Sequence, residues 1–308
     1  DKYRDVYRHM AEGAQKLVPG DNIAPALAAL QSGLLAAPGE PPREAVLEPE
    51  SVEENPVEEN PVEETVAAAD GAAQPTDPIQ AVRREIERWR NHFADLDAMA
   101  EELADELRLG AGDLYGPIAE RLRVKHQLTI RSLPETVLPD KLRRLDLHAR
   151  QLQLSEMLDP ASRTFQAALL LGQIEARAEI DALAAGGNFE DRSAEKLFRR
   201  HLCSYFAAAL MMPYARFLRA CEQNGYRIQV LQRRFGAGFE QVAHRLTTLQ
   251  RVGARGLPFF MLRIDRSGMI SKRYSGASNA PMVESDYRCP LWNIHRVFEQ
   301  PAEIQPQL

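Results

Sequence analysis

A run of acidic, proline-interrupted sequence divides this chain and limits what it can fold into. Residues 37–77 hold twelve Asp and Glu residues against a single base, Arg43. The unit VEENP occurs at Val52–Pro56 and again at Val57–Pro61, and then decays to VEET. A proline at every fifth position interrupts helices, and neighbouring like charges repel, so this segment cannot bury a core. We predict a disordered acidic linker over residues 37–77, which serves as a solvated spacer or, alternatively, as a motif for a partner.

The linker leaves two other regions, a short helical N-terminal segment at residues 1–36 and one folded domain at residues 78–308. The first segment has no basic recognition face of the kind that a DNA-reading helix-turn-helix needs. The chain starts at Asp1, from which we expect it to be a piece of a longer protein. It contains no run of eighteen apolar residues, so we predict no membrane partner and no membrane span.

Charge and cysteine usage bound the function further. Although the net charge is −6, residues 201–308 hold fourteen Lys and Arg residues against seven acids. The folded C-terminal part is therefore basic. The three cysteines, Cys203, Cys221 and Cys289, are far apart and form no CxxC pair. This usage predicts a reducing, cytoplasmic setting and argues against a disulfide framework or a zinc ribbon.

The apolar spacing predicts an α+β fold, mostly helical, with a small antiparallel sheet and a C-terminal β-hairpin. Asp77 and Pro78 are a helix-start signal, and apolar residues at helical spacing continue to Leu109, which predicts one long helix. That helix packs along its own core or serves as a dimerisation helix. Three short alternating stretches predict the antiparallel sheet; they are Leu128–Arg131, Leu145–His148 and Leu152–Leu154.

Further helices are predicted from Pro160 to Gly186, from about Asp191 to Pro213, and over Tyr214–Asn224. The stretch Phe239–Ser275 then joins a short apolar-faced helix, a basic Gly-rich turn and a hairpin, and contains seven basic residues. Cations interleaved with this much apolar surface suit a ligand that has both an anionic and an apolar part.

Two segments carry a resemblance to a known family. RHLCSYFAAALMMPYARFL and FEQVAHRLTTLQRVGARGLPFFMLRIDRSGMISKR, together with CPLWNIHRVFEQP, resemble the short-chain fatty acyl-CoA regulators of bacteria. The resemblance covers about residues 79–301. It implies a transcription factor of propionate, glyoxylate and fatty-acid metabolism with an XRE-type helix-turn-helix, a middle domain similar to the zinc-peptidase-like IrrE/ImmA fold, and a C-terminal cysteine-containing domain.

The resemblance implies that this chain senses a short-chain acyl-CoA and acts as a homodimer. DNA would be contacted only through a helix-turn-helix domain that is not recognisable here, and the family's C-terminal cysteine cluster is not present either. A direct nucleic-acid contact through the basic C-terminal face is an alternative, because FGAGFEQVAHRL has a small-residue turn followed by a helix. The apolar hairpin that follows would leave little of that helix for a groove.

The residues argue against an enzyme. Metallopeptidase relatives place His-Glu-x-x-His on the helix that reads TFQAALLLGQIEARAEI here, where Leu169, Leu170 and Gln173 stand at the motif positions. Leucine cannot ligate a metal, so we predict no catalytic residue, no metal and no cofactor. Cys203 lies among apolar neighbours, as a packed, inert thiol does. An IrrE/ImmA-like protein with residual or atypical hydrolase activity is the alternative.

A coenzyme A ligand needs cations for its phosphates, a flat side chain for adenine and an apolar slot for the acyl group. We expect phosphate contacts from the basic residues of the hairpin unit, and His244 and Tyr205 nearer the acyl end. Trp292 either stacks on adenine or anchors the terminal segment. The complete predicted ligand-binding set is Tyr205, His244, Arg245, Arg251, Arg263, Lys272, Arg273 and Trp292.

Overall fold

The computed structural model describes residues 77–110, 113–139, 141–266, 270–276 and 294–300. The predictions for residues 1–36, for the linker up to residue 76 and for Trp292 lie outside the described residues. The helices are α3 (Pro78–Arg88), α4 (Ala94–Glu106), α5 (Tyr115–His126), α6 (Pro160–Glu175), α7 (Arg177–Gly186), α8 (Arg192–Met211), α9 (Tyr214–Gln223), α10 (Ile228–Phe235), α11 (Phe239–Thr247) and α13 (Ile294–Glu299). The strands are β1 (Thr129–Leu133), β2 (Arg143–Asp146), β3 (Gln151–Ser155), β4 (Phe260–Ile264) and β5 (Ile270–Ser275).

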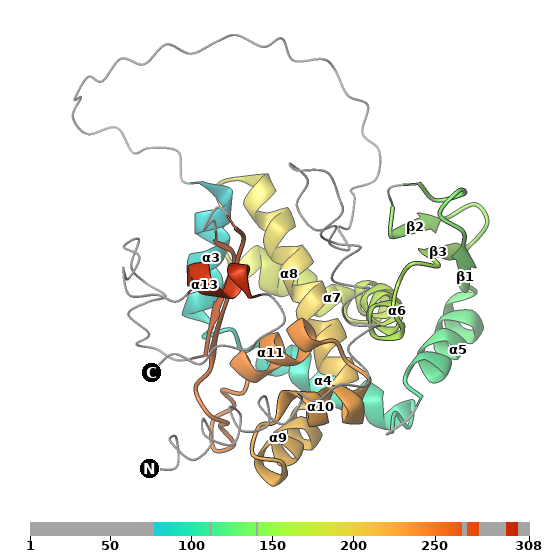
Figure 1. Ribbon diagram of the computed structural model, residues 1–308. Coiled ribbons are helices and arrows are strands. Elements are labelled where there is room, and N and C mark those ends of the chain that lie inside the picture. Colours follow the sequence, from blue (N-terminus) through green and yellow to red (C-terminus); the bar gives the residue numbers. More distant parts are fainter. Residues whose placement is uncertain (1–76, 111–112, 140, 267–269, 277–293, 301–308) are drawn as a thin grey trace.

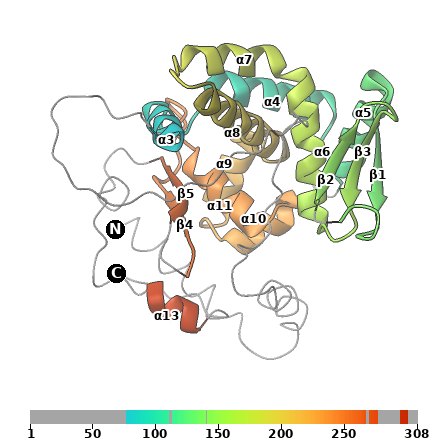
Figure 2. The ribbon, with the colours of Figure 1, turned by 90° about the horizontal axis from the view of Figure 1, so that it is seen from above.

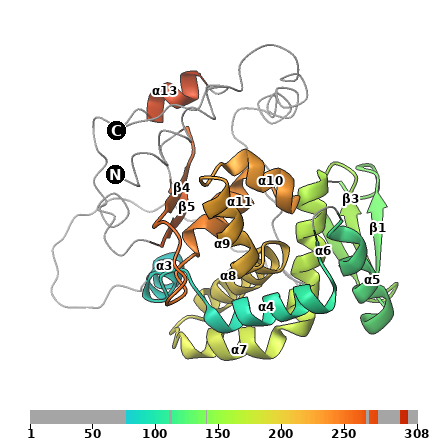
Figure 3. The same cartoon turned by 90° about the horizontal axis from the view of Figure 1, so that it is seen from below.

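The fold is α+β, as predicted, and helix α8 lies at its centre (Figure 1). Helices α3, α4, α6, α7 and α11 all pack against α8. The three-stranded sheet and α5 lie on one side of this helical core, and the β4–β5 hairpin lies with α3 on the opposite side (Figures 2 and 3). The described residues contain no helix that is long and apolar enough to cross a membrane.

Acidic caps start three of the helices. The side chains of Asp77, Asp159 and Asp191 accept hydrogen bonds from backbone N–H groups in the first turns of α3, α6 and α8. Such a carboxylate satisfies N–H groups that have no partner within the helix. The predicted starts of these helices are confirmed, as is the end of α8 just before Pro213.

The predicted single helix from Pro78 to Leu109 is wrong, because the chain turns between α3 and α4. Arg90 and Asn91 adopt left-handed backbone angles, with φ of 51° and 49°. Asn91 is fully buried, and its side-chain amide donates a hydrogen bond of 2.8 Å to Oγ1 of Thr247. Asn adopts the left-handed region more readily than most residues. The contact with α11 therefore stabilises a break that the apolar spacing does not reveal.

The predicted helix from Pro160 to Gly186 is also two helices. Ala176 joins them with φ −98° and ψ 12°, outside the helical region. Helix α6 packs against α5 and α8, whereas α7 packs against α4 and α8. The break thus lets the two halves bury their apolar faces against different partners.

The three-stranded sheet is mixed rather than antiparallel. Its order is β1-β3-β2, with β2 antiparallel to β3 and β1 parallel to β3. A tight turn joins β2 to β3, in which the Asp146 carboxylate accepts a hydrogen bond from the backbone N–H of Ala149. Alternation of apolar residues identifies strands but carries no information on their relative direction.

The C-terminal hairpin is confirmed. Strand β4 pairs antiparallel with β5 and begins at Phe260, three residues later than predicted. The hairpin contacts α11 and α3. Arg83 on α3 donates a 3.3 Å hydrogen bond to the backbone carbonyl of Ile270 on β5.

A buried ion pair ties the helical core together. Arg245 on α11 and Asp97 on α4 are both completely buried, with 2.6 Å between Nη2 and Oδ1. Asp97 also accepts a hydrogen bond of 2.7 Å from the Tyr205 hydroxyl on α8. Burial alone would raise the pKa of Asp97, but the charge of Arg245 and the hydrogen bonds from His92 and Tyr205 outweigh it and lower that pKa. Three helices therefore share one charged contact.

Replacing Asp97 by Asn should destabilise the fold by about 3–5 kcal/mol, because Arg245 would keep its charge without a partner. The measurement is urea unfolding followed by circular dichroism. Glu120→Gln is the matched control, since the Glu120–Arg123 pair is more than half exposed on both sides. It should leave the unfolding midpoint unchanged. Equal midpoints for the two variants would contradict a structural role for the buried pair.

Candidate functional site

The structure brings together α8 and the hairpin unit, which carry the described residues of the predicted ligand-binding set. Helix α11 packs against α8, and strands β4 and β5 pack against α11. The predicted residues on these elements, however, already have partners inside the protein. Their contacts decide which of them could meet a ligand.

The cations of the hairpin face carboxylates. Lys272 Nζ lies 2.7 Å from Oε1 of Glu240 on α11, and Arg263 Nη1 lies 3.5 Å from the other oxygen of the same carboxylate. Arg273 Nε lies 3.7 Å from Oε1 of Glu87 on α3. These ion pairs fasten the hairpin to its two neighbouring helices. A phosphate would have to compete with them.

Arg251 lies apart from the hairpin cations. Its Nη2 is 2.5 Å from Oε2 of Glu101 on α4, and its guanidinium carbon lies 4.1 Å from the ring centroid of Tyr214. Its backbone N–H donates to the Tyr214 hydroxyl at 2.8 Å. Arg251 thus holds the segment that follows α11 against α4 and α9.

Two predicted contact residues are buried in the core. Tyr205 is 1% exposed and Arg245 0%. Besides Asp97, Arg245 donates to the Met212 carbonyl and to the Thr248 hydroxyl, each at 3.0 Å. The prediction that these two side chains contact ligand does not fit this arrangement, because neither has surface to offer. Sequence shows that an arginine is present but not that a buried carboxylate faces it.

His244 belongs to a partly buried aromatic cluster under the hairpin. Its ring centroid lies 4.4 Å from that of Tyr274 on β5 and 6.0 Å from that of His201 on α8. Burial, with a contribution from Lys272, lowers the pKa of His201 to about 4. Burial and the positive charges around it hold the pKa of His244 well below its usual value. Nε2 of His201 is buried and has no hydrogen-bond partner among the described residues.

Helix α6 shows what stands at the metallopeptidase positions. Leu169 and Leu170 are buried, and the side-chain oxygen of Gln173 accepts a 3.5 Å hydrogen bond from Arg143 on β2. In the part of the chain that the structure describes, no group of three or more His, Cys, Asp or Glu side chains could hold a metal ion. Burial raises the pKa of the Cys203 thiol to about 11. The two leucines therefore offer no metal ligand at these positions, and the Cys203 thiol stays protonated near neutral pH.

Glu175, at the end of α6, has a histidine neighbour that the sequence did not reveal. His126 on α5 places Nε2 at 2.7 Å from Oε1 of Glu175, and Arg121 and Lys125 contact the same carboxylate. Burial alone would raise the pKa of Glu175. The hydrogen bonds from Arg121, His126 and Lys125 outweigh the effect of burial and lower this pKa to about 2. The cluster fastens α5 to α6.

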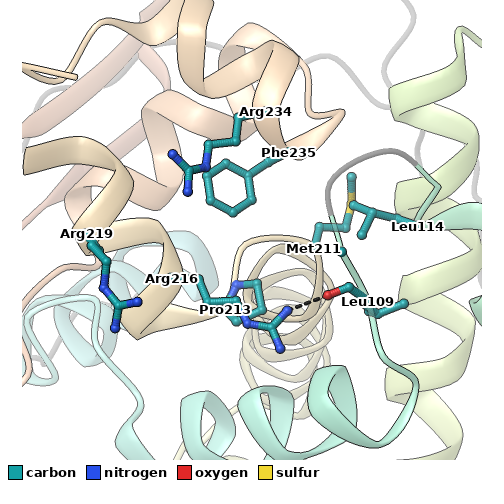
Figure 4. Close-up of a pocket in the computed structure, with 9 residues that line it drawn as sticks. Leu109, Leu114, Met211, Pro213, Arg216, Arg219, Arg234 and Phe235 are labelled. Atoms are coloured by element: carbon teal, nitrogen blue, oxygen red, sulfur yellow. Dashed lines mark hydrogen bonds between the residues drawn. The ribbon is translucent and has the colours of Figure 1, made fainter. Parts of the chain in front are cut away.

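A pocket at the C-terminal end of α8 combines arginine side chains with an apolar wall. The sequence analysis did not predict this pocket. Arg219 and Arg234 lie on one side and Leu109, Leu114 and Met211 on the other, with Arg216 between them and its guanidinium next to Leu109 (Figure 4). Phe235, Pro213 and Gly110 complete the lining, and the pocket is open to solvent, with a volume of about 160 Å³ accessible to water. None of the seven predicted residues that the structure describes lines it.

The pocket arginines differ in their partners. Arg216 contacts the Leu109 carbonyl and the Asp105 carboxylate. Arg219 and Arg234 are exposed and form no hydrogen bond or ion pair with any described residue. Sequence offered one weak signal, the i, i+3 spacing of Arg216 and Arg219 on α9. Their convergence with Arg234 depends on how α9 and α10 pack.

Two known families match consecutive parts of the folded region. Residues 248–308 match the family described as short-chain fatty acyl coenzyme A regulator, C-terminal. Residues 123–247 match the IrrE N-terminal-like domain. The chain belongs to the short-chain fatty acyl-CoA regulator family. The resemblance found in the sequence is thereby confirmed.

Relatives of this family member are transcription regulators by name. The HTH-type transcriptional regulator RamB of Mycobacterium tuberculosis is 35% identical over 241 residues, 77% of this chain and 50% of the relative. PrpR of the same species is 37% identical over 232 residues, 75% of this chain and 47% of the relative. The propionyl-CoA carboxylase regulator of Cereibacter sphaeroides is 40% identical over 160 residues, 51% of this chain and 34% of the relative. The chain spans about half the length of RamB and PrpR.

A solved structure shares the fold. The chain titled Mycobacterium tuberculosis transcriptional regulator superposes with a TM-score of 0.69 at 35% identity, covering 73% of this chain and 67% of that one. The relatives are named as transcription regulators. This chain also contains a part that matches the IrrE N-terminal-like domain.

The buried histidines make stability depend on pH. His201 has a pKa of about 4 when folded, against 6.5 for an ordinary histidine, so the unfolded chain binds more protons between these values. The contribution of neutral His201 to the free energy of unfolding is therefore complete above pH 6.5 and is lost as the pH falls toward 4. From pH 7 to pH 5 the free energy of unfolding should fall by roughly 2 kcal/mol on account of His201 alone.

Urea unfolding at pH 7, 6 and 5 measures this effect. His201→Phe should flatten the pH dependence in this range, and His148→Gln, at an exposed position, should not. An unchanged slope in His201→Phe would show that His201 is not neutral in the folded protein.

Proposed function

We propose that this chain is the acyl-CoA-sensing part of a bacterial transcription regulator. The family that its C-terminal part matches is described as short-chain fatty acyl coenzyme A regulator, and its relatives are named as regulators, one of them of propionyl-CoA carboxylase. Contact with DNA would come from a helix-turn-helix domain elsewhere in the regulator. That the protein works in the cytoplasm and as a homodimer stays a prediction.

The observation that carries the proposal is the pocket at the C-terminal end of α8. Coenzyme A presents phosphates, a flat adenine ring and an extended arm that ends in the acyl thioester. Arg219 and Arg234 offer guanidinium groups without carboxylate partners among the described residues, and guanidinium groups bind phosphate oxygens in pairs. Phe235 offers a flat apolar face next to Arg234 (Figure 4).

The apolar side of the pocket suits the rest of the ligand. Leu109 and Leu114 lie in the connection between α4 and α5, and Met211 is the last residue of α8. A methionine side chain adapts its shape to small apolar groups. Because the pocket opens to solvent, the adenosine part of a long ligand can extend beyond it.

A ligand in this pocket would bridge several elements of the fold. Its lining comes from α8, α9, α10 and the connection between α4 and α5. Binding shifts a conformational equilibrium only if the ligand has different affinities for the two arrangements. We therefore assign the sensing step to the relative position of α9 and α10 against the end of α4, where the cations and the apolar residues meet.

The hairpin unit holds the remaining predicted ligand residues in a supporting role. Arg263, Lys272 and Arg273 would reach a phosphate only by exchanging their carboxylate partners Glu240 and Glu87. This exchange would break ion pairs that hold the hairpin against α11 and α3. The pocket requires no such exchange at Arg219 and Arg234.

Calorimetry with acetyl-, propionyl- and free coenzyme A tests the proposal. The double variant Arg219→Gln/Arg234→Gln should bind at least about tenfold more weakly, because each lost charge-assisted hydrogen bond contributes about 1.5–3 kcal/mol. Arg233→Gln is the matched control, since Arg233 is exposed on the same helix but does not line the pocket.

Two outcomes would contradict the proposal in different ways. No binding of any of the three ligands below about millimolar concentration would exclude acyl-CoA sensing by this chain. Tight binding that is equal in the wild type and in the double variant would leave sensing intact and exclude this pocket as its site.

A further inference from the structure

Arg216 differs from the other two arginines of the pocket because a carboxylate already contacts it. Its Nη2 donates to Oδ1 of Asp105, and its Nη1 donates to the carbonyl oxygen of Leu109. Asp105 lies on the last turn of α4 and Leu109 follows that helix, whereas Arg216 lies on the first turn of α9. The guanidinium lines the pocket next to Leu109 (Figure 4). A ligand that enters the pocket would therefore meet Arg216 with Asp105 bound to it.

The carboxyl end of α4 depends on cations from other helices. Its last turn contains Asp105 and Glu106 and no basic residue, although the backbone carbonyls at a helix end already give it a partial negative charge. Arg121 on α5 pairs with Glu106, with 2.6 Å between Nη1 and Oε1. Arg216 on α9 provides the cation for Asp105. Withdrawal of Arg216 would thus leave a negative charge uncompensated at the end of the helix where it is least favourable.

The Arg216–Asp105 ion pair is open to water on both sides. The side chain of Arg216 is 41% exposed and that of Asp105 is 72% exposed. Ion pairs this exposed contribute little to stability, because water screens both charges. A phosphate group carries up to two negative charges and accepts parallel hydrogen bonds from a guanidinium. A phosphate in the pocket can therefore take the place of Asp105 at Arg216.

A separate contact keeps α9 attached to α4 when Arg216 changes its partner. Glu101, one turn before Asp105, accepts a hydrogen bond of 2.7 Å from the backbone N–H of Ala215 at the start of α9. The other carboxylate oxygen of Glu101 accepts a hydrogen bond of 2.5 Å from Arg251. Neither Glu101 nor Ala215 lines the pocket. Loss of the Arg216–Asp105 pair would therefore loosen the last turn of α4 without separating the two helices.

We propose that Asp105 competes with the ligand for Arg216, and that a phosphate of bound acyl-CoA replaces Asp105 and loosens the last turn of α4. In this step, Nη2 of Arg216 leaves Oδ1 of Asp105 and donates to a phosphate oxygen instead. The ligand then has a higher affinity for the arrangement in which the ion pair is open, which is the difference in affinity that a sensor requires. This inference rests on the proposed function, because it needs an anionic ligand in the pocket.

Calorimetry of the full chain with propionyl-CoA measures the competition. Asp105→Asn should bind about two- to fivefold more tightly than the wild type, because binding no longer breaks an exposed ion pair. Arg216→Gln should bind at least about tenfold more weakly, because it loses a charge-assisted hydrogen bond to phosphate. Glu102→Gln is the matched control and should bind like the wild type. Glu102 is exposed on the same helix and forms no ion pair with any described residue.

Hydrogen exchange of backbone amides gives a readout besides affinity. The N–H groups of Leu107 and Leu109 donate to carbonyl groups of the last turn of α4. Saturating propionyl-CoA should make their exchange about two- to fivefold faster in the wild type, because the turn opens more often once Arg216 has left it. Arg216→Gln should show this faster exchange without ligand, and Glu102→Gln should not.

The outcomes separate this inference from the proposed function. Equal affinity of Asp105→Asn and Glu102→Gln for propionyl-CoA would overturn the competition for Arg216 while acyl-CoA sensing stands. Binding that leaves exchange at Leu107 and Leu109 unchanged or slower would overturn the loosening of α4, again without affecting the proposed function. Absence of binding in the wild type would overturn both proposals.

Discussion

The Asp97–Arg245 ion pair is the contact on which the arrangement of the helices depends. A charge pair with no solvent exposure is retained only if its geometry is kept, because either partner alone is costly to bury. Arg245 also donates to the carbonyl of Met212, and the flanking residues Met211 and Pro213 line the arginine pocket. The position of α11 is therefore coupled through one hydrogen bond, from Arg245 to Met212, to the rim of the proposed acyl-CoA site.

The distribution of arginines separates structure from binding in this protein. Arg245, Arg251, Arg263 and Arg273 meet carboxylates from other elements, and these contacts hold the fold together. A second group meets none within the described residues; it comprises Arg219 and Arg234 at the pocket, Arg143 on β2 and Arg163 on α6. An unpaired guanidinium beside apolar surface gains most from an incoming anion. The partners of each cation, not the number of cations in a segment, indicate where ligands bind.

Local signals in the sequence predicted the helix starts at Pro78, Pro160 and Arg192, the end before Pro213 and the hairpin, because caps, prolines and alternation act over a few residues. The break at Asn91 escaped prediction because it depends on a hydrogen bond to Thr247, far along the chain. The candidate site escaped for the same reason. Arg216, Arg219 and Arg234 converge only after α9 and α10 have packed, and the burial of Tyr205 and Arg245 is set by Asp97 on another helix.

The turn between α3 and α4 determines how force would pass through the molecule. Helix α3 contacts the hairpin through Arg83 and through the Glu87–Arg273 pair, whereas α4 beyond the turn belongs to the helical core. A displacement applied at Pro78 would thus reach both the hairpin and α8, because α3 packs against both. A single straight helix would transmit a displacement rigidly to the core. Two helices joined at Arg90 and Asn91 can instead change their angle at this turn.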